Sequence, residues 1–210
     1  MIRAIIFDYN QVLADDFSAH REAYKKAFNK YGIKLADDEI TRILHMPRKY
    51  KIDYLKERHG LQEDNEHIFK EKEKEFFRIA KTRSLLFPET EEAIEKLSKK
   101  FALGIFTGTN LEQMLIPEKT MKLFKAIVTI TDYEKPKPHP EGLFKCIERL
   151  KISANECAYV GDSPPDMEVA KTVGCKAIGK TTGIFSAEQL KEAGAEIIIR
   201  DLKELVEMGL

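Results

Sequence analysis

An acidic side chain, Asp8, ends the first apolar run of the chain, and an amide, Asn10, follows two residues later. In an open α/β sheet, ligands bind at the edge formed by the carboxyl ends of the strands. Asp8 is therefore a candidate nucleophile or metal ligand. A second carboxylate at position 10 would complete an acid–base pair, but an amide cannot carry protons at neutral pH. Asp8 and Asn10 together indicate chemistry that normally uses two carboxylates, of which the second is replaced by an amide.

Three later segments also follow apolar runs and carry polar residues. They are Thr107-Gly108-Thr109-Asn110, Glu134-Lys135-Pro136-Lys137-Pro138-His139-Pro140 and Gly161-Asp162-Ser163-Pro164-Pro165-Asp166. The first offers hydroxyls and backbone N–H groups that can hold an anion above a helix N-terminus. The second is a proline-stiffened loop that carries Lys135 and leads into a helix. The third places two carboxylates, Asp162 and Asp166, four residues apart.

Phosphoryl transfer needs residues of these types. A carboxylate attacks phosphorus in line, Mg²⁺ and a lysine neutralise the equatorial oxygens, and hydroxyl and amide donors hold the group. Mg²⁺ takes oxygen ligands and keeps several waters, so Asp8, Asp162 and Asp166 suffice to bind it. The ammonium of Lys135 would also keep Asp8 ionised at neutral pH. The sequence therefore predicts metal-assisted phosphoryl transfer.

Short apolar runs alternate with helical patterns along most of the chain, which predicts a parallel sheet covered on both faces. The predicted strands are residues 2–7, 102–106, 126–130, 157–160, 176–179 and 196–199. Helical spacing marks residues 89–99, 142–150 and 165–173 between them. We therefore expect an α/β fold with a doubly wound parallel sheet. The four motifs all follow predicted strands, so they can converge at one edge.

Residues 16–84 interrupt this alternation because they have no strand pattern. Their apolar residues recur three or four positions apart, as in Tyr24, Phe28 and Tyr31, which is typical of helices that pack together. These aromatic residues are expected to pack in a core. We expect a core domain of residues 1–15 and 85–210 and a small helical-bundle domain of residues 16–84.

The charges of the chain balance, with 35 Lys and Arg against 35 Asp and Glu. Such a chain has no bulk field to gather nucleic acid or anionic lipid. The first apolar run is too short for a signal peptide or a membrane span. We therefore expect a cytoplasmic protein with neither nucleic-acid nor membrane partners. Cys146, Cys157 and Cys175 lack zinc-site spacing and are expected to be buried, reduced thiols.

The four motifs, in this order, resemble those of the haloacid dehalogenase-like (HAD) hydrolase superfamily. The matching residues are Asp8-x-Asn10, Thr107, Lys135-Pro136-x-Pro138 and Gly161-Asp162-Ser163-x-x-Asp166. The resemblance spans nearly the whole chain and implies a Rossmann-like core with a helical cap inserted after the first motif. It also implies that Asp8 is nucleophile and metal ligand, that Thr107 binds phosphate, and that Lys135 stabilises charge. Asp162 and Asp166 would be the metal-binding carboxylates.

The resemblance implies an activity as well. A member with these motifs would be a Mg²⁺-dependent phosphatase that acts on a small phosphorylated metabolite through an aspartyl-phosphate on Asp8. The backbone N–H of Gly108 would help Thr107 and Lys135 to hold the phosphate. The chain would work as a monomer or a homodimer.

Two residues depart from the pattern of the superfamily. Its phosphatases usually carry Asp at the position of Asn10, where the carboxyl group protonates the leaving group and then activates water. General acid–base catalysis contributes about 10²–10⁴-fold, so we expect slow or specialised turnover. The metal contact from this position is a backbone carbonyl, which Asn10 retains, so Mg²⁺ binding should survive. Gln11 replaces the usual glycine, and the turn that follows is expected to differ in shape.

Two assignments within the motifs have alternatives. Lys137 competes with Lys135 for the ammonium role, but the KPxP alignment favours Lys135 and predicts that Lys137 is solvated. Asp166 is either a metal ligand or a charge at a helix N-terminus.

The insertion carries further polar candidates. Asp15 and His20 stand where many capped members have an acidic residue and a histidine. The proline-broken segment that contains His45, Arg48 and Lys49 either recognises an anionic substrate or forms a charged surface turn.

Two other functions remain open from the sequence. The same superfamily contains metal-free 2-haloacid dehalogenases, which use an equivalent of Asp8 and lack the second aspartate, but the pair Asp162 and Asp166 argues for a metal. A non-catalytic protein that binds phosphate ligands is the other alternative, because Asn10 lacks the acid. Asn10 would also suit a chain engineered to trap a complex.

Overall fold

The computed structural model describes residues 1–44, 46 and 48–209. The chain divides into two compact units. One consists of Met1–Asp15 with Leu86–Leu210, and the other is Asp16–Leu85. This division lies one residue from the boundary expected at 84/85.

The larger unit contains a parallel sheet of six strands in the order β3-β2-β1-β4-β5-β6. The strands are β1 (Ala4–Phe7), β2 (Ala102–Phe106), β3 (Phe124–Val128), β4 (Cys157–Gly161), β5 (Lys176–Lys180) and β6 (Ile197–Ile199). From β1, the chain builds the sheet first toward β3 and then, from β4, toward β6. This reversal creates a switch point between β1 and β4, where doubly wound sheets bind their ligands.

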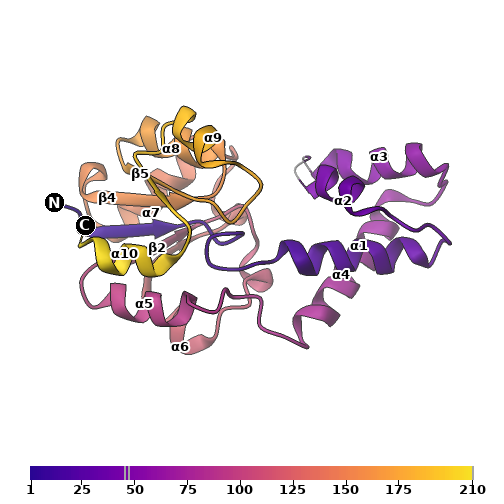
Figure 1. Ribbon diagram of the computed structural model, residues 1–210, viewed down its shortest axis with the longest axis horizontal. Coiled ribbons are helices and arrows are strands. Elements are labelled where there is room, and N and C mark those ends of the chain that lie inside the picture. Colours follow the sequence, from indigo (N-terminus) through magenta and orange to yellow (C-terminus); the bar gives the residue numbers. More distant parts are fainter. Residues whose placement is uncertain (45, 47, 210) are drawn as a thin grey trace. The chain divides into compact units, whose positions relative to one another are not determined.

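Helices cover both faces of this sheet (Figure 1), which confirms the predicted α/β class. They are α5 (Thr90–Ser98), α6 (Glu118–Met121), α7 (Glu141–Leu150), α8 (Pro164–Val173), α9 (Ala187–Glu192) and α10 (Leu202–Met208). Helices α7 and α8 pack together against β2 to β5, whereas α5 and α10 pack together on the other face.

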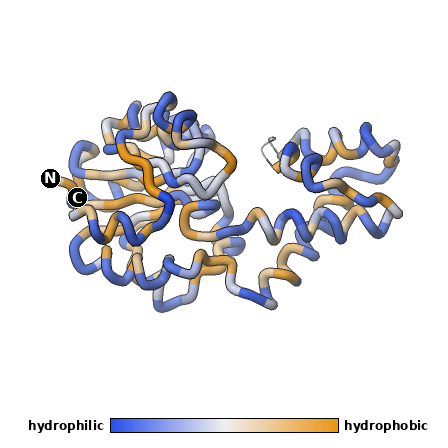
Figure 2. The backbone as a smooth tube through the Cα atoms, viewed as in Figure 1, coloured by the Kyte–Doolittle hydropathy of each residue, from blue (hydrophilic) through white to orange (hydrophobic). Residues whose placement is uncertain are grey.

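Burial on both faces explains why the strands read as continuous apolar runs. All four residues of β1 are fully buried, and the strands are the hydrophobic centre of this unit in Figure 2. The expected strand 126–130 was misplaced by two residues. Phe124 pairs with Leu103, whereas Ile130 lies 46% exposed and begins a short 3₁₀ turn that Thr129 and Asp132 cap.

The smaller unit consists of four helices and the segments that join them, and its described residues contain no strand. Its helices are α1 (Phe17–Asn29), α2 (Asp37–Leu44), α3 (Arg48–His59) and α4 (Asn65–Ala80). Tyr24, Phe28 and Ile40 belong to its buried core, and Tyr31 packs against that core. None of the described helices is long and apolar enough to cross a membrane.

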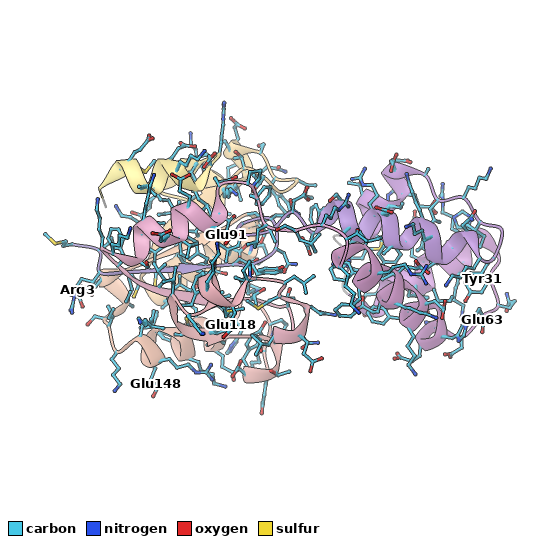
Figure 3. The ribbon with its side chains drawn as sticks, turned by 90° about the horizontal axis from the view of Figure 1, so that it is seen from below. Arg3, Tyr31, Glu63, Glu91, Glu118 and Glu148 are labelled. Atoms are coloured by element: carbon cyan, nitrogen blue, oxygen red, sulfur yellow. The ribbon has the colours of Figure 1, made fainter. Side chains whose placement is uncertain are left out.

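Charged side chains of both signs mix on the surface (Figure 3). Glu91 lies 2.9 Å from Lys119, and Glu118 lies 2.6 Å from Lys122. Exposed pairs of this kind contribute little to stability, about 0–1 kcal/mol each. Because the two signs mix on the surface, a charged ligand must be recognised by a local group of charges and not by the net charge of the protein.

Candidate active site

Asp8 and Asp162 lie on either side of the switch point. Asp8 directly follows β1, and its backbone N–H donates to Val160 O at 2.9 Å. Asp162 directly follows Gly161, the last residue of the neighbouring strand β4. The parallel register therefore brings together two carboxylates that lie more than 150 positions apart in the sequence.

A third carboxylate, Asp166, joins them from the first turn of α8. One oxygen from each of Asp8, Asp162 and Asp166 lies within 4.8 Å of the others. The cluster is largely buried, and Asp166 is 1% exposed. A Cβ at Gly161 would lie 2.2 Å from the Cβ of Asp166, so this close approach requires glycine. Within the described residues, this is the one acidic cluster with metal-site spacing.

The ammonium at this cluster belongs to Lys137. Its Nζ lies 2.8 Å from Asp166 Oδ1 and 3.2 Å from Asp8 Oδ1, and its side chain is 14% exposed. The expectation that Lys135 supplies this charge and that Lys137 is solvated was wrong. Lys135 is exposed, and its backbone N–H donates to Glu141.

A sequence signal for Lys137 did exist. The loop contains two overlapping KPxP patterns, one beginning at Lys135 and one at Lys137. The second ends at Pro140, immediately before α7 begins at Glu141. The number of residues between the lysine and the start of α7 therefore identifies Lys137 as the lysine that reaches the carboxylates, whereas the KPxP motif fits both lysines.

Asp166 holds Lys137 in place as well as contributing to the carboxylate cluster. Besides Lys137, its Oδ1 lies 3.0 Å from the hydroxyl of Tyr159. Its Oδ2 accepts the N–H of Ser163 at 3.1 Å and the hydroxyl of Ser163 at 2.5 Å, which completes a capping box at the start of α8. Asp166 therefore does act as a charge at the N-terminus of α8, the second of the two roles considered from the sequence. Sequence reasoning missed Tyr159, because nothing in the pattern of β4 marks this tyrosine.

The charges of the cluster are only partly balanced. Burial raises the pKa of Asp8 to about 6, while Lys137 opposes this rise and Asp166 adds to it. Burial by itself would lower the pKa of Lys137, but Asp166 and Asp8 outweigh it and raise that pKa above its usual value. Burial also disfavours the Asp166 carboxylate, yet Lys137 and the hydrogen-bond donors keep its pKa low. The ammonium of Lys137 thus pairs with two of the three carboxyl groups of the cluster, those of Asp8 and Asp166.

Asn10 lies beside the hydroxyls that follow β2. Its side-chain oxygen accepts from Thr109 Oγ1 at 2.5 Å and from Thr107 Oγ1 at 3.5 Å. Thr107 is fully buried, and its backbone N–H donates to Val128 O. The adjacent Gly108 is exposed. The structure therefore brings Asp8, Asn10 and the predicted phosphate-binding segment to one edge of the sheet.

Gln11 adopts a left-handed backbone, with φ of 56°. This conformation disfavours residues with a Cβ by about 1–2 kcal/mol. The turn keeps it nevertheless, since the Gln11 N–H donates to Ala14 O at 2.7 Å and its side-chain amide lies 3.3 Å from Asp15 Oδ1. A changed shape of this turn stays a prediction, since the backbone at Gln11 is one that glycine would adopt without strain.

The helical unit contains its own buried polar cluster. Lys72 is 3% exposed, and its Nζ lies 2.8 Å from His20 Nδ1 and 2.8 Å from Glu73 Oε1. His20 Nε2 lies 3.3 Å from Asp16, and the His20 ring stacks on Phe76. Sequence reasoning singled out His20 but missed its partner, because 52 residues separate it from Lys72.

Lys51 is a second, partly buried cation of the helical unit, and its Nζ donates to Leu44 O at 3.1 Å. Burial, together with repulsion from Lys72, lowers the pKa of Lys51 to about 8. A perturbed lysine of this kind is a candidate for ligand binding. Of the neighbouring residues proposed from sequence, His45 lies outside the described residues, and the side chains of Arg48 and Lys49 are likewise not described.

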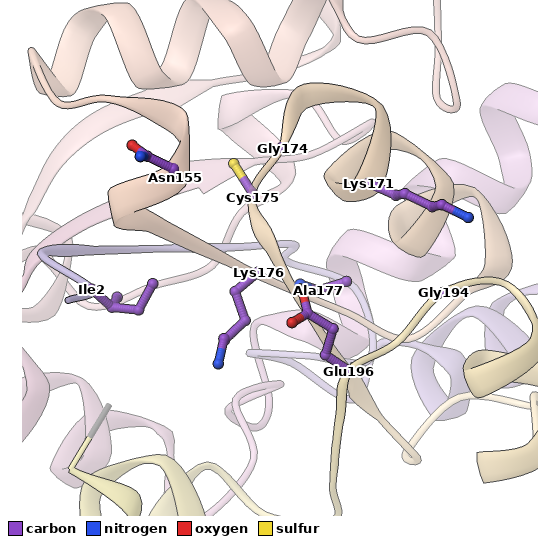
Figure 4. Close-up of a pocket in the computed structure, with 9 residues that line it drawn as sticks. All are labelled: Ile2, Asn155, Lys171, Gly174, Cys175, Lys176, Ala177, Gly194 and Glu196. Atoms are coloured by element: carbon purple, nitrogen blue, oxygen red, sulfur yellow. Dashed lines mark hydrogen bonds between the residues drawn. The ribbon is translucent and has the colours of Figure 1, made fainter.

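An open cavity of about 510 Å³ lies at the opposite ends of the strands (Figure 4). Ile2 and Cys175 line it, just before β1 and β5 begin. Its two lysines, Lys171 and Lys176, point in different directions in Figure 4 and do not converge on a common ligand position. The carboxylate cluster is therefore the stronger candidate for the chemistry.

Comparison with known proteins agrees with this geometry. The family model of haloacid dehalogenase-like hydrolases matches residues 5–180. The chain is 27% identical, over 95% of its length and 94% of the relative, to a phosphorylated carbohydrates phosphatase of Thermotoga maritima. It is also 27% identical to a phosphoglycolate phosphatase of Escherichia coli, over 61% of this chain and about half (52%) of that protein.

Solved structures share the whole fold. A Thermotoga maritima protein provisionally named beta-phosphoglucomutase has a TM-score of 0.87 at 25% identity, with complete coverage of both chains. A HAD-superfamily hydrolase of Geobacter sulfurreducens has a TM-score of 0.77 at 22% identity, with 99% of this chain and 96% of that chain covered.

Proposed function

We propose that this chain, a phosphatase-type enzyme that belongs to the haloacid dehalogenase-like hydrolase family, hydrolyses phosphate monoesters of small carbohydrates or related metabolites through Asp8. One observation carries the proposal: the ammonium of Lys137 lies 3.2 Å from Asp8 at the switch point of the sheet, beside two further carboxylates. The phosphorylated carbohydrates phosphatase among its relatives supports the substrate class.

In the proposed first step, Asp8 attacks the phosphorus atom and the bond to the ester oxygen breaks. Asp8 Oδ1 accepts the Tyr9 N–H at 2.8 Å and faces Lys137, so we assign Oδ2 as the attacking atom. The leaving oxygen takes a proton from solvent water, because Asn10 supplies none, and departs as an alcohol. Lys137 attracts the negative charge of the phosphoryl oxygens, and the Thr107 hydroxyl and the Gly108 N–H orient them.

In the second step, water attacks the aspartyl-phosphate. The bond between phosphorus and Asp8 breaks, inorganic phosphate leaves, and the carboxylate of Asp8 is restored. The proton that the attacking water loses in this second step returns to the solvent. Each step requires a proton transfer to or from an oxygen atom that lies beside residue 10. The amide of Asn10 cannot donate or accept this proton. We therefore propose slow turnover in which these proton transfers limit the rate.

The carboxylate cluster fits a Mg²⁺ ion. Buried oxygen ligands suit a hard cation. Burial, and more weakly the charge of Asp166, raise the pKa of Asp8 against the opposing effect of Lys137, and a bound cation would favour the ionised form. Asp8 and Asp162 would hold the ion with the backbone carbonyl of Asn10. Asp166 would be a weaker ligand, since both of its oxygens already accept protein hydrogen bonds. When bound, the ion neutralises charge on the phosphate oxygens.

Replacing Gly183 by Ala should weaken Mg²⁺ binding by about 10-fold or more, a typical effect of disturbing the surroundings of a metal ligand. A Cβ at Gly183 would lie 2.1 Å from Asp162 Oδ2, so the carboxylate must move. Isothermal titration with Mg²⁺ measures the effect. Gly108→Ala is the matched control, because its Cβ would meet its nearest neighbour, the Tyr133 hydroxyl, at an ordinary 3.7 Å. Equal affinities for both variants would remove Asp162 from the metal site.

Hydrolysis of a panel of sugar phosphates and other small phosphate monoesters tests the proposed function. We expect slow release of inorganic phosphate with Mg²⁺, none with EDTA, and at least a 10²-fold loss in Asp8→Asn, which lacks the nucleophile. Halide release from 2-haloacids in EDTA would favour the dehalogenase alternative. Tight binding of a phosphorylated ligand, with no turnover even after Asn10→Asp, would favour the non-catalytic alternative suggested by Asn10.

We further propose that residues 16–85 act as a cap that restricts substrates to small molecules. The buried Lys72 and the partly buried Lys51 support this role, because they gather positive charge within one helical unit, and such charge attracts an anionic ligand. Their position in a separate compact unit is the pattern expected of a specificity module.

A further inference from the structure

Lys180, the last residue of β5, is a fully buried lysine outside the four motifs. Its Nζ donates to Val12 O at 2.9 Å and lies 3.3 Å from Glu89 Oε1. The ammonium also lies 3.8 Å from the centre of the Phe87 ring. Lys180 therefore reaches both the turn after Asn10 and the segment that leads into α5.

The turn after Asn10 has its backbone carbonyls held one after another. The Gln11 carbonyl accepts from the Thr182 hydroxyl, and the next carbonyl, that of Val12, accepts from Lys180. The Leu13 carbonyl accepts from Thr90 Oγ1 at 2.8 Å, and from the backbone N–H of Phe87 at 3.1 Å. Three consecutive carbonyls thus depend on donors from two distant segments, and Lys180 supplies the central one.

Holding a carbonyl with a buried ammonium costs free energy, because the charged group is removed from water. Burial lowers the pKa of Lys180, and Glu89 offsets this by attraction, as Asp201 and Asp162 do more weakly. The neutral residues Val12 and Phe87 contribute a carbonyl and a ring face, both of which favour a cation. An apolar residue would fill the same space without this cost but would leave the Val12 carbonyl unpaired.

We propose that Lys180, paired with Glu89, is a positioning residue that holds the turn of residues 10–13 and so sets where residue 10 stands relative to Asp8. The chain reverses direction within four residues of Asp8, and residue 10 is the position at which the reaction moves protons. A displacement of about 1 Å there would cost much of any proton transfer. Lys180 acts through the backbone and does not itself touch the substrate.

Lys180→Met tests this inference in two backgrounds, the native chain and Asn10→Asp. With Asp at position 10, we expect kcat to fall about 10-fold or more while KM changes less than about twofold. In the native chain, where residue 10 transfers no proton, kcat should fall by less than about threefold. Lys176→Met, at the other end of β5, is the matched control and should change neither. An equal fall in both backgrounds would overturn the proposal.

Amide hydrogen exchange is the second readout. In Lys180→Met, the amides of Gln11, Leu13 and Ala14, which donate within the turn, should exchange about 10-fold faster or more. Those of Ile5 and Ile6 should not change. Unchanged exchange in the turn overturns the proposal.

The kinetic arm rests on the proposed function, whereas the exchange arm does not. If no variant hydrolyses any ester, the proposed function fails and exchange alone decides on Lys180. If Lys180→Met does not fold, Glu89→Gln takes its place. It should give the same pattern at smaller amplitude, and its absence would equally overturn the proposal.

Discussion

Replacing Asn10 by Asp is expected to raise kcat for phosphate monoesters by about 10²-fold or more in the presence of Mg²⁺, because general acid–base catalysis contributes about 10²–10⁴-fold. The side chains differ only in one group, and the carboxylate keeps an oxygen that Thr109 can donate to, as it does to Asn10 at 2.5 Å. The gain should therefore come without loss of the local structure. Steady-state hydrolysis of the same ester panel measures it.

The dependence on the leaving group provides the control for this prediction. An acyl phosphate releases a weakly basic leaving group that needs little protonation, so it should gain less from Asn10→Asp than a sugar phosphate does. A uniform gain for all substrates would point to an effect on binding instead. Equal rates for the two proteins would mean that another group already carries the protons.

Lys137→Met should lower kcat by about 10²–10³-fold, the usual effect of losing one group that stabilises developing charge. Lys137 also lowers the pKa of Asp8. Without it, that pKa rises further, and the acid limb of the pH–rate profile should move to higher pH. The matched variant Lys135→Met removes an exposed ammonium from the same loop and should leave both kcat and the profile unchanged.

Folding must be separated from chemistry in this comparison. Loss of Lys137 leaves Asp166 with an unpaired buried charge, and breaking such a pair typically costs about 3–5 kcal/mol. Urea unfolding of Lys137→Met and Lys137→Arg measures that cost. Arg retains the charge, so it should restore much of the stability and the acid limb. A loss of activity in Lys135→Met equal to that in Lys137→Met would contradict the assignment.

Much of the architecture follows from local pattern. The alternation of apolar strands with helical spacing is legible because parallel strands are buried on both faces. Four of the six expected strands therefore begin and end within one residue of the observed strands, and the strand expected at 2–7 begins two residues later, at Ala4. The helical character of the insertion is equally clear. The strand expected at 126–130 was misplaced because an exposed Ile130 continues the apolar run by chance.

The sequence by itself determined the residue types for phosphoryl transfer and the strand ends that carry them, because these depend on neighbours along the chain. Only the tertiary structure decided that Lys137, and not Lys135, reaches Asp8. It also decided that Asp166 pairs with this lysine and that Lys180 donates to the carbonyl of Val12 in the turn after Asn10. Those contacts join residues 29 to 168 positions apart in the sequence. The register of neighbouring strands brings such residues together, so their proximity cannot be deduced from the spacing of residues within a motif.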